Sequence, residues 1–170
     1  MTARRAAKGP GKRSRAATSV PANLGLRVAI AASRFNEVIT ERLVRAARET
    51  LKAIGVDRRS QTVVYVPGAF ELPLAAKWLC RDGRYDAVIC LGAVIRGDTP
   101  HFDVISRAVS RGIMNVGLTE GRPVVFGVLT TETVEQAEER ADPSRRNCGA
   151  ESARTAVEMA LLARRLNARD

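Results

Sequence analysis

The feature that most constrains how this chain can fold is an apolar run that leads into a helix start within residues 86–103. Residues 87–91 read Ala-Val-Ile-Cys-Leu, which is typical of a buried parallel strand, and Gly92 and Gly97 interrupt the run. The Asp-Thr-Pro sequence at 98–100 then marks the start of a helix. Backbone amides at such a junction lack intrahelical partners and lie at the positive end of the helix dipole, so the junction suits a phosphate or a carboxylate.

The only histidine of the chain, His101, comes in the first turn of this predicted helix. Imidazole exchanges a proton near neutral pH, which makes it a general acid and base. A histidine in this position can equally cap the helix or pack in the core. The stretch alone therefore leaves both a functional and a structural role open.

Strand and helix patterns alternate along the rest of the chain. This alternation predicts an α/β fold in which helices cover both faces of a parallel sheet. Ligands of such sheets bind beyond the carboxyl ends of the strands. Besides the run within 86–103, strands are predicted at 24–32, 61–66 and 123–128, and helices at 39–54, 71–81, 99–115, 134–141 and 149–166. Suggestive residues follow each strand: Phe35 and Asn36, 68–71, 97–101, and Thr130 with Thr131.

Composition restricts the class of protein further. A length of 170 residues is most simply one domain, and no apolar run approaches the ~20 residues that span a bilayer. The three cysteines, Cys80, Cys90 and Cys148, are odd in number and lack CxxC spacing, which argues against a disulfide framework and against a zinc site. No secretory signal pattern is present at the N-terminus, so a cytoplasmic location is expected.

The net charge of +10 is unevenly distributed. Residues 1–20 contain six Lys or Arg and no acidic residue, and they show no apolar period. We therefore predict a disordered basic tail over 1–20 and a folded domain over 21–170. The tail could bind a polyanion weakly, but no aromatic side chain is interleaved with its charges, so nucleic acid is an unlikely partner.

Five motifs, taken together and in order, resemble the lumazine synthase family, whose members catalyse the penultimate step of riboflavin biosynthesis. They are SRFN at 33–36, PGAFELP at 67–73, GAVIRGDTPHFD at 92–103, FGVLTT at 126–131 and NCGAE at 147–151. The resemblance covers about residues 22–167. It implies a flavodoxin-like three-layer α/β/α sandwich built on a four-stranded parallel sheet, which agrees with the fold expected from the pattern.

The resemblance also implies a reaction. The substrates are 5-amino-6-(D-ribitylamino)uracil and 3,4-dihydroxy-2-butanone 4-phosphate, and the products are 6,7-dimethyl-8-ribityllumazine, phosphate and water. The amine attacks the ketone to form an imine, phosphate leaves by elimination, and the second amine closes the ring. No metal or redox cofactor is implied.

Residue roles follow from the same resemblance. His101 matches the catalytic histidine, and Glu151 matches a supporting residue. The charge of Asp98 would oppose a phosphate unless its side chain caps the helix. The pyrimidine and ribityl set comprises Phe35, Asn36, Ala69, Phe70, Glu71, Ala93, Val94, Ile95 and Phe126, and the phosphate set comprises Gly97, Asp98, Thr99 and Arg140.

Family members assemble as homopentamers or as shells of twelve pentamers, and the residue matching Phe126 reaches the pyrimidine from a neighbouring subunit. The resemblance also implies riboflavin synthase as a partner. One departure is Cys148, which stands where the family typically has lysine, and Arg145 or Arg146 are candidates to replace the missing cation. The departure leaves open a flavin- or lumazine-binding, shell-forming paralogue with little activity.

Overall fold

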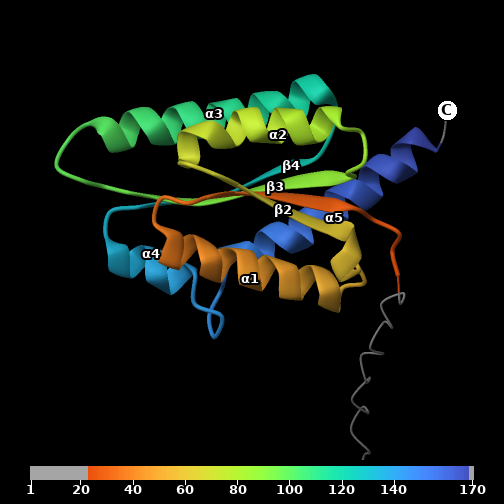
Figure 1. Ribbon diagram of the computed structural model, residues 1–170, viewed down its shortest axis with the longest axis horizontal. Helices are drawn as coiled ribbons and strands as arrows, with labels where there is room; N and C mark the ends of the chain where they lie inside the picture. Colours follow the sequence, from red (N-terminus) through yellow and green to blue (C-terminus); the bar gives the residue numbers. More distant parts are fainter. Residues whose placement is uncertain (1–22, 169–170) are drawn as a thin grey trace, which may run out of the picture.

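The computed structural model of the chain describes residues 23–168, and its centre is a four-stranded parallel sheet in the order β2-β1-β3-β4 (Figure 1). The predicted basic tail at 1–20 lies outside the described residues. The elements are β1 (Val28–Ser33), α1 (Glu37–Ala53), η1 (Arg58–Ser60), β2 (Gln61–Val66), η2 (Ala69–Glu71), α2 (Leu72–Arg81), β3 (Ala87–Ile95), α3 (His101–Glu120), β4 (Val124–Thr131), α4 (Val134–Arg140) and α5 (Cys148–Asn167).

Helices cover both faces of the sheet, so the predicted flavodoxin-like α/β/α sandwich is confirmed. Helices α2 and α3 lie on one face, and α1, α4 and α5 lie on the other (Figure 1). Alternate residues of β1 serve the two layers: Val28 and Ile30 pack in the core under α1 and α5, whereas Ala29 and Ala31 pack in the core under α2 and α3. None of the helices within residues 23–168 is long and apolar enough to cross a membrane.

The predicted break of the third strand at Gly92 is wrong. Strand β3 continues to Ile95, which pairs in register with Thr131, because β4 also runs three residues beyond the predicted end at 128. Gly92 leaves room there for the Ser33 side chain, since a Cβ atom would lie 2.7 Å from the Ser33 hydroxyl oxygen. The longer pairing carries both strand ends toward the start of α3.

The ends of other elements also differ from the prediction. Strand β1 begins at Val28 rather than at residue 24, although Leu26 is already buried in the core. Helix α3 begins at His101 rather than at 99 and extends past the predicted end at 115, up to Gly121, whose φ of 61° ends it in the left-handed conformation.

Candidate functional site

A pocket of about 350 Å³ opens at the carboxyl ends of β1, β2 and β3, on the side of the sheet covered by α2 and α3. Nine of the predicted site residues line it together: Phe35, Ala69, Phe70, Ala93, Val94, Ile95, Gly97, Thr99 and His101. They come from three separate segments, 35, 69–70 and 93–101, and the sheet brings these segments to one edge. The predicted residues of this group therefore lie together beyond the strand ends, and their binding of a ligand stays a prediction.

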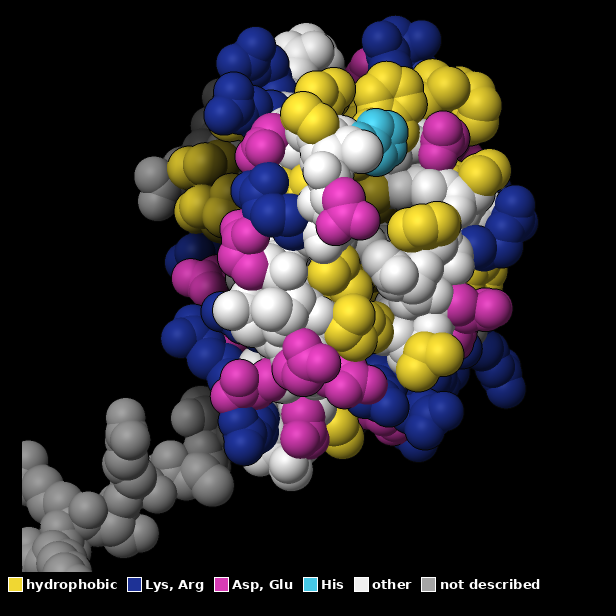
Figure 2. All heavy atoms as spheres, turned by 90° about the vertical axis from the view of Figure 1, so that its left-hand side faces the viewer, with side chains coloured by type: hydrophobic (Ala, Val, Ile, Leu, Met, Phe, Trp, Pro, Cys, Tyr) yellow, Lys and Arg dark blue, Asp and Glu magenta, His cyan; other side chains and the backbone are white. Residues whose placement is uncertain are grey.

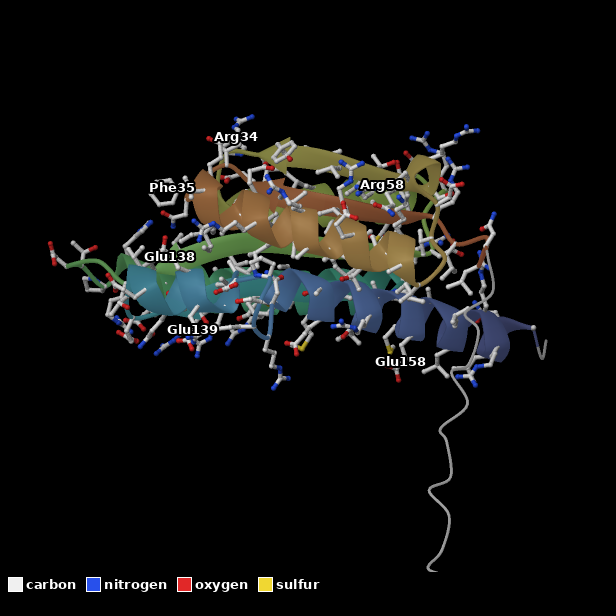
Figure 3. All side chains as sticks on the ribbon, turned by 90° about the horizontal axis from the view of Figure 1, so that it is seen from below. Arg34, Phe35, Arg58, Glu138, Glu139 and Glu158 are labelled. Carbon is white, nitrogen blue, oxygen red and sulfur yellow. The ribbon has the colours of Figure 1, made fainter. Side chains whose placement is uncertain are left out.

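Exposed aromatic side chains form the rim of this pocket. Phe35 is 71% exposed and Phe70 is 59% exposed, so neither is a core residue. Figure 3 shows Phe35 at the end of the molecule where α4 also lies, with Glu138 and Glu139 nearby in that view and Arg58 at the opposite end. A large exposed aromatic ring beside a pocket is suited to stacking on a planar ligand.

His101 is the first residue of α3, and its side chain is exposed at the pocket. Figure 2 shows the histidine side chain among hydrophobic ones on this face of the molecule. No side chain caps α3, and Pro100 occupies the N-cap position, so the suggested capping role of Asp98 is wrong. The uncapped amides of the first turn are available to an anion.

Three predicted residues, Asn36, Glu71 and Asp98, do not line the His101 pocket but are sequence neighbours of residues that line it. The Asn36 side-chain amide donates a hydrogen bond of 2.9 Å to the Ala93 carbonyl, while its own backbone has a φ of 58°. A Glu71 carboxylate oxygen accepts one of 2.9 Å from the Gly68 amide. These two side chains hold the backbone that forms the pocket, and Asp98 is exposed near its edge.

The remaining three predicted residues lie elsewhere in the chain. Arg140 and Glu151 line a pocket of about 520 Å³ with Arg145, Arg146 and Cys148. Phe126 lines an adjoining pocket of about 420 Å³ that shares Cys148 and Glu151. Arg140 and Glu151 belong to α4 and α5, which cover the sheet face opposite to α3 (Figure 1). Within one chain, the predicted site is therefore split in two.

The cations of the second pocket differ in how they are paired. Arg145 pairs with Glu139, and Arg146 pairs with Glu151. Arg140 donates to the Gln136 carbonyl at 3.2 Å, and over residues 23–168 it has no carboxylate within ion-pair distance. Arg140 is thus the cation of this pocket whose charge is least neutralised.

A family model described as 6,7-dimethyl-8-ribityllumazine synthase matches residues 25–164, which is most of the chain. The chain belongs to this family. It is accordingly an enzyme of riboflavin biosynthesis that acts on small-molecule substrates and forms 6,7-dimethyl-8-ribityllumazine by condensation. Within the described residues, no group of three or more His, Cys, Asp or Glu side chains is arranged to hold a metal ion.

The NCGAE motif of this lumazine synthase family member has a clear structural basis. Asn147 is buried and caps α5: its side-chain oxygen accepts from the amides of Gly149 and Ala150 at 2.9 and 3.2 Å, and its amide group donates to the Ala141 carbonyl at 2.6 Å. A Cβ at Gly149 would lie 2.1 Å from the Leu43 carbonyl oxygen, so only glycine lets α5 approach α1 this closely.

Cys148 lies between these two residues as the first residue of α5 and is half-buried. Burial raises the pKa of its thiol. The thiol therefore stays neutral at physiological pH and supplies no charge to the pocket of Arg140.

Sequence reasoning missed three residues at or beside the His101 pocket. Phe102 and Ile105 line the pocket, as does Gly68 of the suggestive 68–71 cluster, and Arg96 contacts the first turn of α3. Gly68 and Phe102 lie inside the motifs that carried the resemblance, and Ile105 is one helical turn after His101. Their position inside or next to those motifs could have indicated these residues. Such a position does not, however, show which side chains face the pocket.

Proposed function

We propose that the lumazine-forming active site is shared between two copies of the chain. The His101 pocket is one half, and the surface formed by Phe126, Arg140 and Glu151 is the other. The observation that carries this proposal is the separation of Arg140 and Glu151 from His101 onto opposite faces of one sheet, although one reaction needs both. A neighbouring copy in a symmetric homo-oligomer, such as a closed ring, can supply the missing half.

The His101 half is suited to the ribitylaminouracil. Phe35 offers an exposed ring face for the pyrimidine, and the end of β3 at Ala93–Ile95 offers backbone groups beside it. The turn at Ala69–Glu71, held by the bond between Glu71 and Gly68, is suited to the hydroxyl groups of the ribityl chain. Phe126, 41% exposed on edge strand β4, would close the pyrimidine site from the neighbouring copy.

The phosphate of the second substrate would lie against the uncapped start of α3. Gly97 and Thr99 provide backbone amides and a hydroxyl there, and the helix dipole favours negative charge. The guanidinium of Arg140, which lacks a carboxylate partner among residues 23–168, would complete the site with two parallel hydrogen bonds.

His101 then stands between the phosphate site and the pyrimidine site. It would take a proton as the amine attacks the ketone, return one as water leaves the carbinolamine to form the imine, and assist the proton loss that accompanies phosphate elimination. Each step needs a group that both accepts and donates near neutral pH, which imidazole does.

The first experiment is a turnover assay of the purified chain with both substrates, followed by the absorbance of the lumazine. The wild-type chain should form product, and His101→Ala should slow kcat by roughly 10²–10⁴-fold while light scattering shows an unchanged assembly. A wild-type chain that binds flavin tightly without forming product would overturn the proposal in favour of a binding paralogue.

The second experiment tests the shared site by complementation. Two chains, one with His101→Ala and one with Arg140→Ala, are each expected to be nearly inactive. When they are co-expressed in equal amounts and assemble at random, about a quarter of the shared sites combine two intact halves, so activity should return to about that fraction. Recovery no greater than the sum of the two single variants would show that each chain builds its own site.

A further inference from the structure

Arg96 directly follows the last residue of β3, and its side chain contacts two other segments. Its two terminal nitrogens donate to the two carboxylate oxygens of Asp103 at 3.0 and 3.2 Å. Its Nε donates to Glu132 at 2.5 Å, and the guanidinium lies 4.2 Å from the centre of the Phe102 ring. One planar cation thereby joins the end of β3, the first turn of α3 and the turn between β4 and α4.

The first turn of α3 has few other anchors. Its N-cap residue is Pro100, no side chain caps it, and residues 96–101 are all exposed. Isolated exposed ion pairs contribute little to stability. Here, however, a two-pronged pair, a second carboxylate and a ring stack all act on one guanidinium, which is the geometry that arginine rather than lysine provides.

The backbone of Arg96 and the turn that contains Glu132 are both held by hydrogen bonds. Its backbone amide donates to the Thr131 carbonyl at 2.9 Å, which continues the pairing of β3 with β4 by one residue. The Glu132 amide in turn donates to the Gln136 side chain at 3.0 Å, so this turn is tied to α4. The guanidinium therefore holds the first turn of α3 in a fixed position relative to the ends of β3 and β4.

The ion pair with Asp103 lies on the side of the helix away from the pocket, whereas the Phe102 ring that Arg96 stacks on lines the pocket. Residues two apart on an α-helix point about 200° apart, so Asp103 faces away from His101. His101 and Phe102 line the pocket, whereas Asp103 and Arg96 do not. Arg96 can therefore set the direction of the imidazole without touching the substrate.

We propose that Arg96 is a positioning residue: it clamps Asp103 and Phe102 and so holds His101 in the orientation needed for proton transfer. The inference rests on the proposed role of His101. The hydrogen bonds from Arg96 also lower the pKa of Asp103, so this carboxylate remains charged and paired throughout the neutral range.

The test compares Arg96→Gln, Arg96→Lys and Asp103→Asn with the matched control Arg81→Gln. Arg81 pairs with Glu120 at 3.2 Å, which is the same kind of surface pair at the other end of α3. Each full-length protein is measured by steady-state kinetics and, independently of activity, by amide hydrogen exchange over residues 98–104.

Arg96→Gln and Asp103→Asn should lower kcat by roughly ten- to a hundredfold with little change in either KM, because a small misplacement of a catalytic group slows chemistry more than binding. Exchange over 98–104 should speed up by about tenfold as local opening becomes easier. Arg96→Lys should show the same pattern more weakly, and Arg81→Gln should leave both readouts unchanged.

Unchanged exchange over 98–104 in Arg96→Gln would overturn the inference, as would a KM that rises while kcat is kept, since Arg96 would then bind substrate. If the wild-type chain forms no lumazine, the proposed function fails instead. The exchange comparison would still decide whether Arg96 holds the turn.

Discussion

At the scale of single residues, several side chains that the motifs single out hold the backbone of the site. Asn36, Glu71 and Asn147 each bond a main-chain group next to a pocket. The sequence motifs were sufficient to single out these three residues, but they did not predict the hydrogen bonds that the side chains make to the main chain. A short polar side chain next to a turn can bind a ligand or satisfy the backbone, and only the folded chain decides between these uses.

Asn36 offers the clearest residue-scale prediction. A backbone φ of 58° is sterically unfavourable for alanine, whereas glycine adopts it without steric strain. Asn36→Gly should lose only the bond to Ala93, about 1 kcal/mol, whereas Asn36→Ala should lose about 1–2 kcal/mol more. Urea unfolding at one protein concentration measures both variants. Equal stability of the two would show that the left-handed conformation is not maintained.

The thiol of Cys148 permits a prediction about pH. Because burial raises its pKa, the reactive thiolate is scarcer than for a free cysteine at pH 7.5 and becomes more abundant as the pH rises. Burial also raises the pKa of Cys80, to about 11. Alkylation followed by peptide mass spectrometry should therefore label both slowly in the native protein and rapidly after unfolding. Rapid labelling of native Cys148 at neutral pH would contradict the assigned environment.

At the scale of elements, the hydrophobic pattern was sufficient to predict each strand and each α-helix, but it predicted only some of their ends, such as those of β2. The predicted stop at Gly92 failed because a glycine that breaks a strand and a glycine that makes room for Ser33 look the same in sequence. The extension of β3 to Ile95 depends on its partner β4, which lies thirty or more residues away in the chain. End positions of this kind are set by pairing rather than by local propensity.

The contact between α1 and α5 gives a prediction at this scale. Gly149→Ala would bring a Cβ into the Leu43 backbone and should lower the free energy of unfolding by about 1–3 kcal/mol or more. Gly117→Ala is the matched control, because the nearest atom to its Cβ would be 3.4 Å away and alanine favours a helix. The control should be neutral or slightly stabilising in the same thermal unfolding assay. A fully stable Gly149→Ala would mean that the two helices can move apart at little cost.

At the scale of the whole molecule, two features are consistent with association between copies of the chain: the split of the predicted site and the exposed apolar residues of α2 and α3. Trp78 is 65% exposed on α2, and Met114 and Leu118 are 62% and 76% exposed on α3. Leaving such side chains in water is unfavourable, and patches of this kind commonly mark contact surfaces. The proposed shared site and this apolar face are thus consistent with a homo-oligomer.

Assembly can be tested through this face. A Met114→Glu, Leu118→Glu double variant should shift light scattering toward smaller species and lose turnover in parallel, because the second half of each site is no longer supplied. Circular dichroism should remain native, since neither side chain is part of the core. Leu166→Glu, an exposed leucine of α5, is the control. Full turnover by a dispersed double variant would contradict a shared site.

The sequence by itself determined the α/β class, the parallel sheet, the clustering of nine predicted site residues at the strand ends and, through its motifs, the family. These depend on local periodicity and on the rule that parallel strands end at one edge. Only the tertiary structure decided that Arg140 and Glu151 lie on the face opposite to His101, and that Arg96 clamps the start of α3. The strand order and the side on which each crossover helix packs depend on contacts between segments far apart in the chain. Motifs that follow one another in the sequence, and that are predicted to serve one reaction, can therefore lie on opposite faces of the sheet in one folded chain.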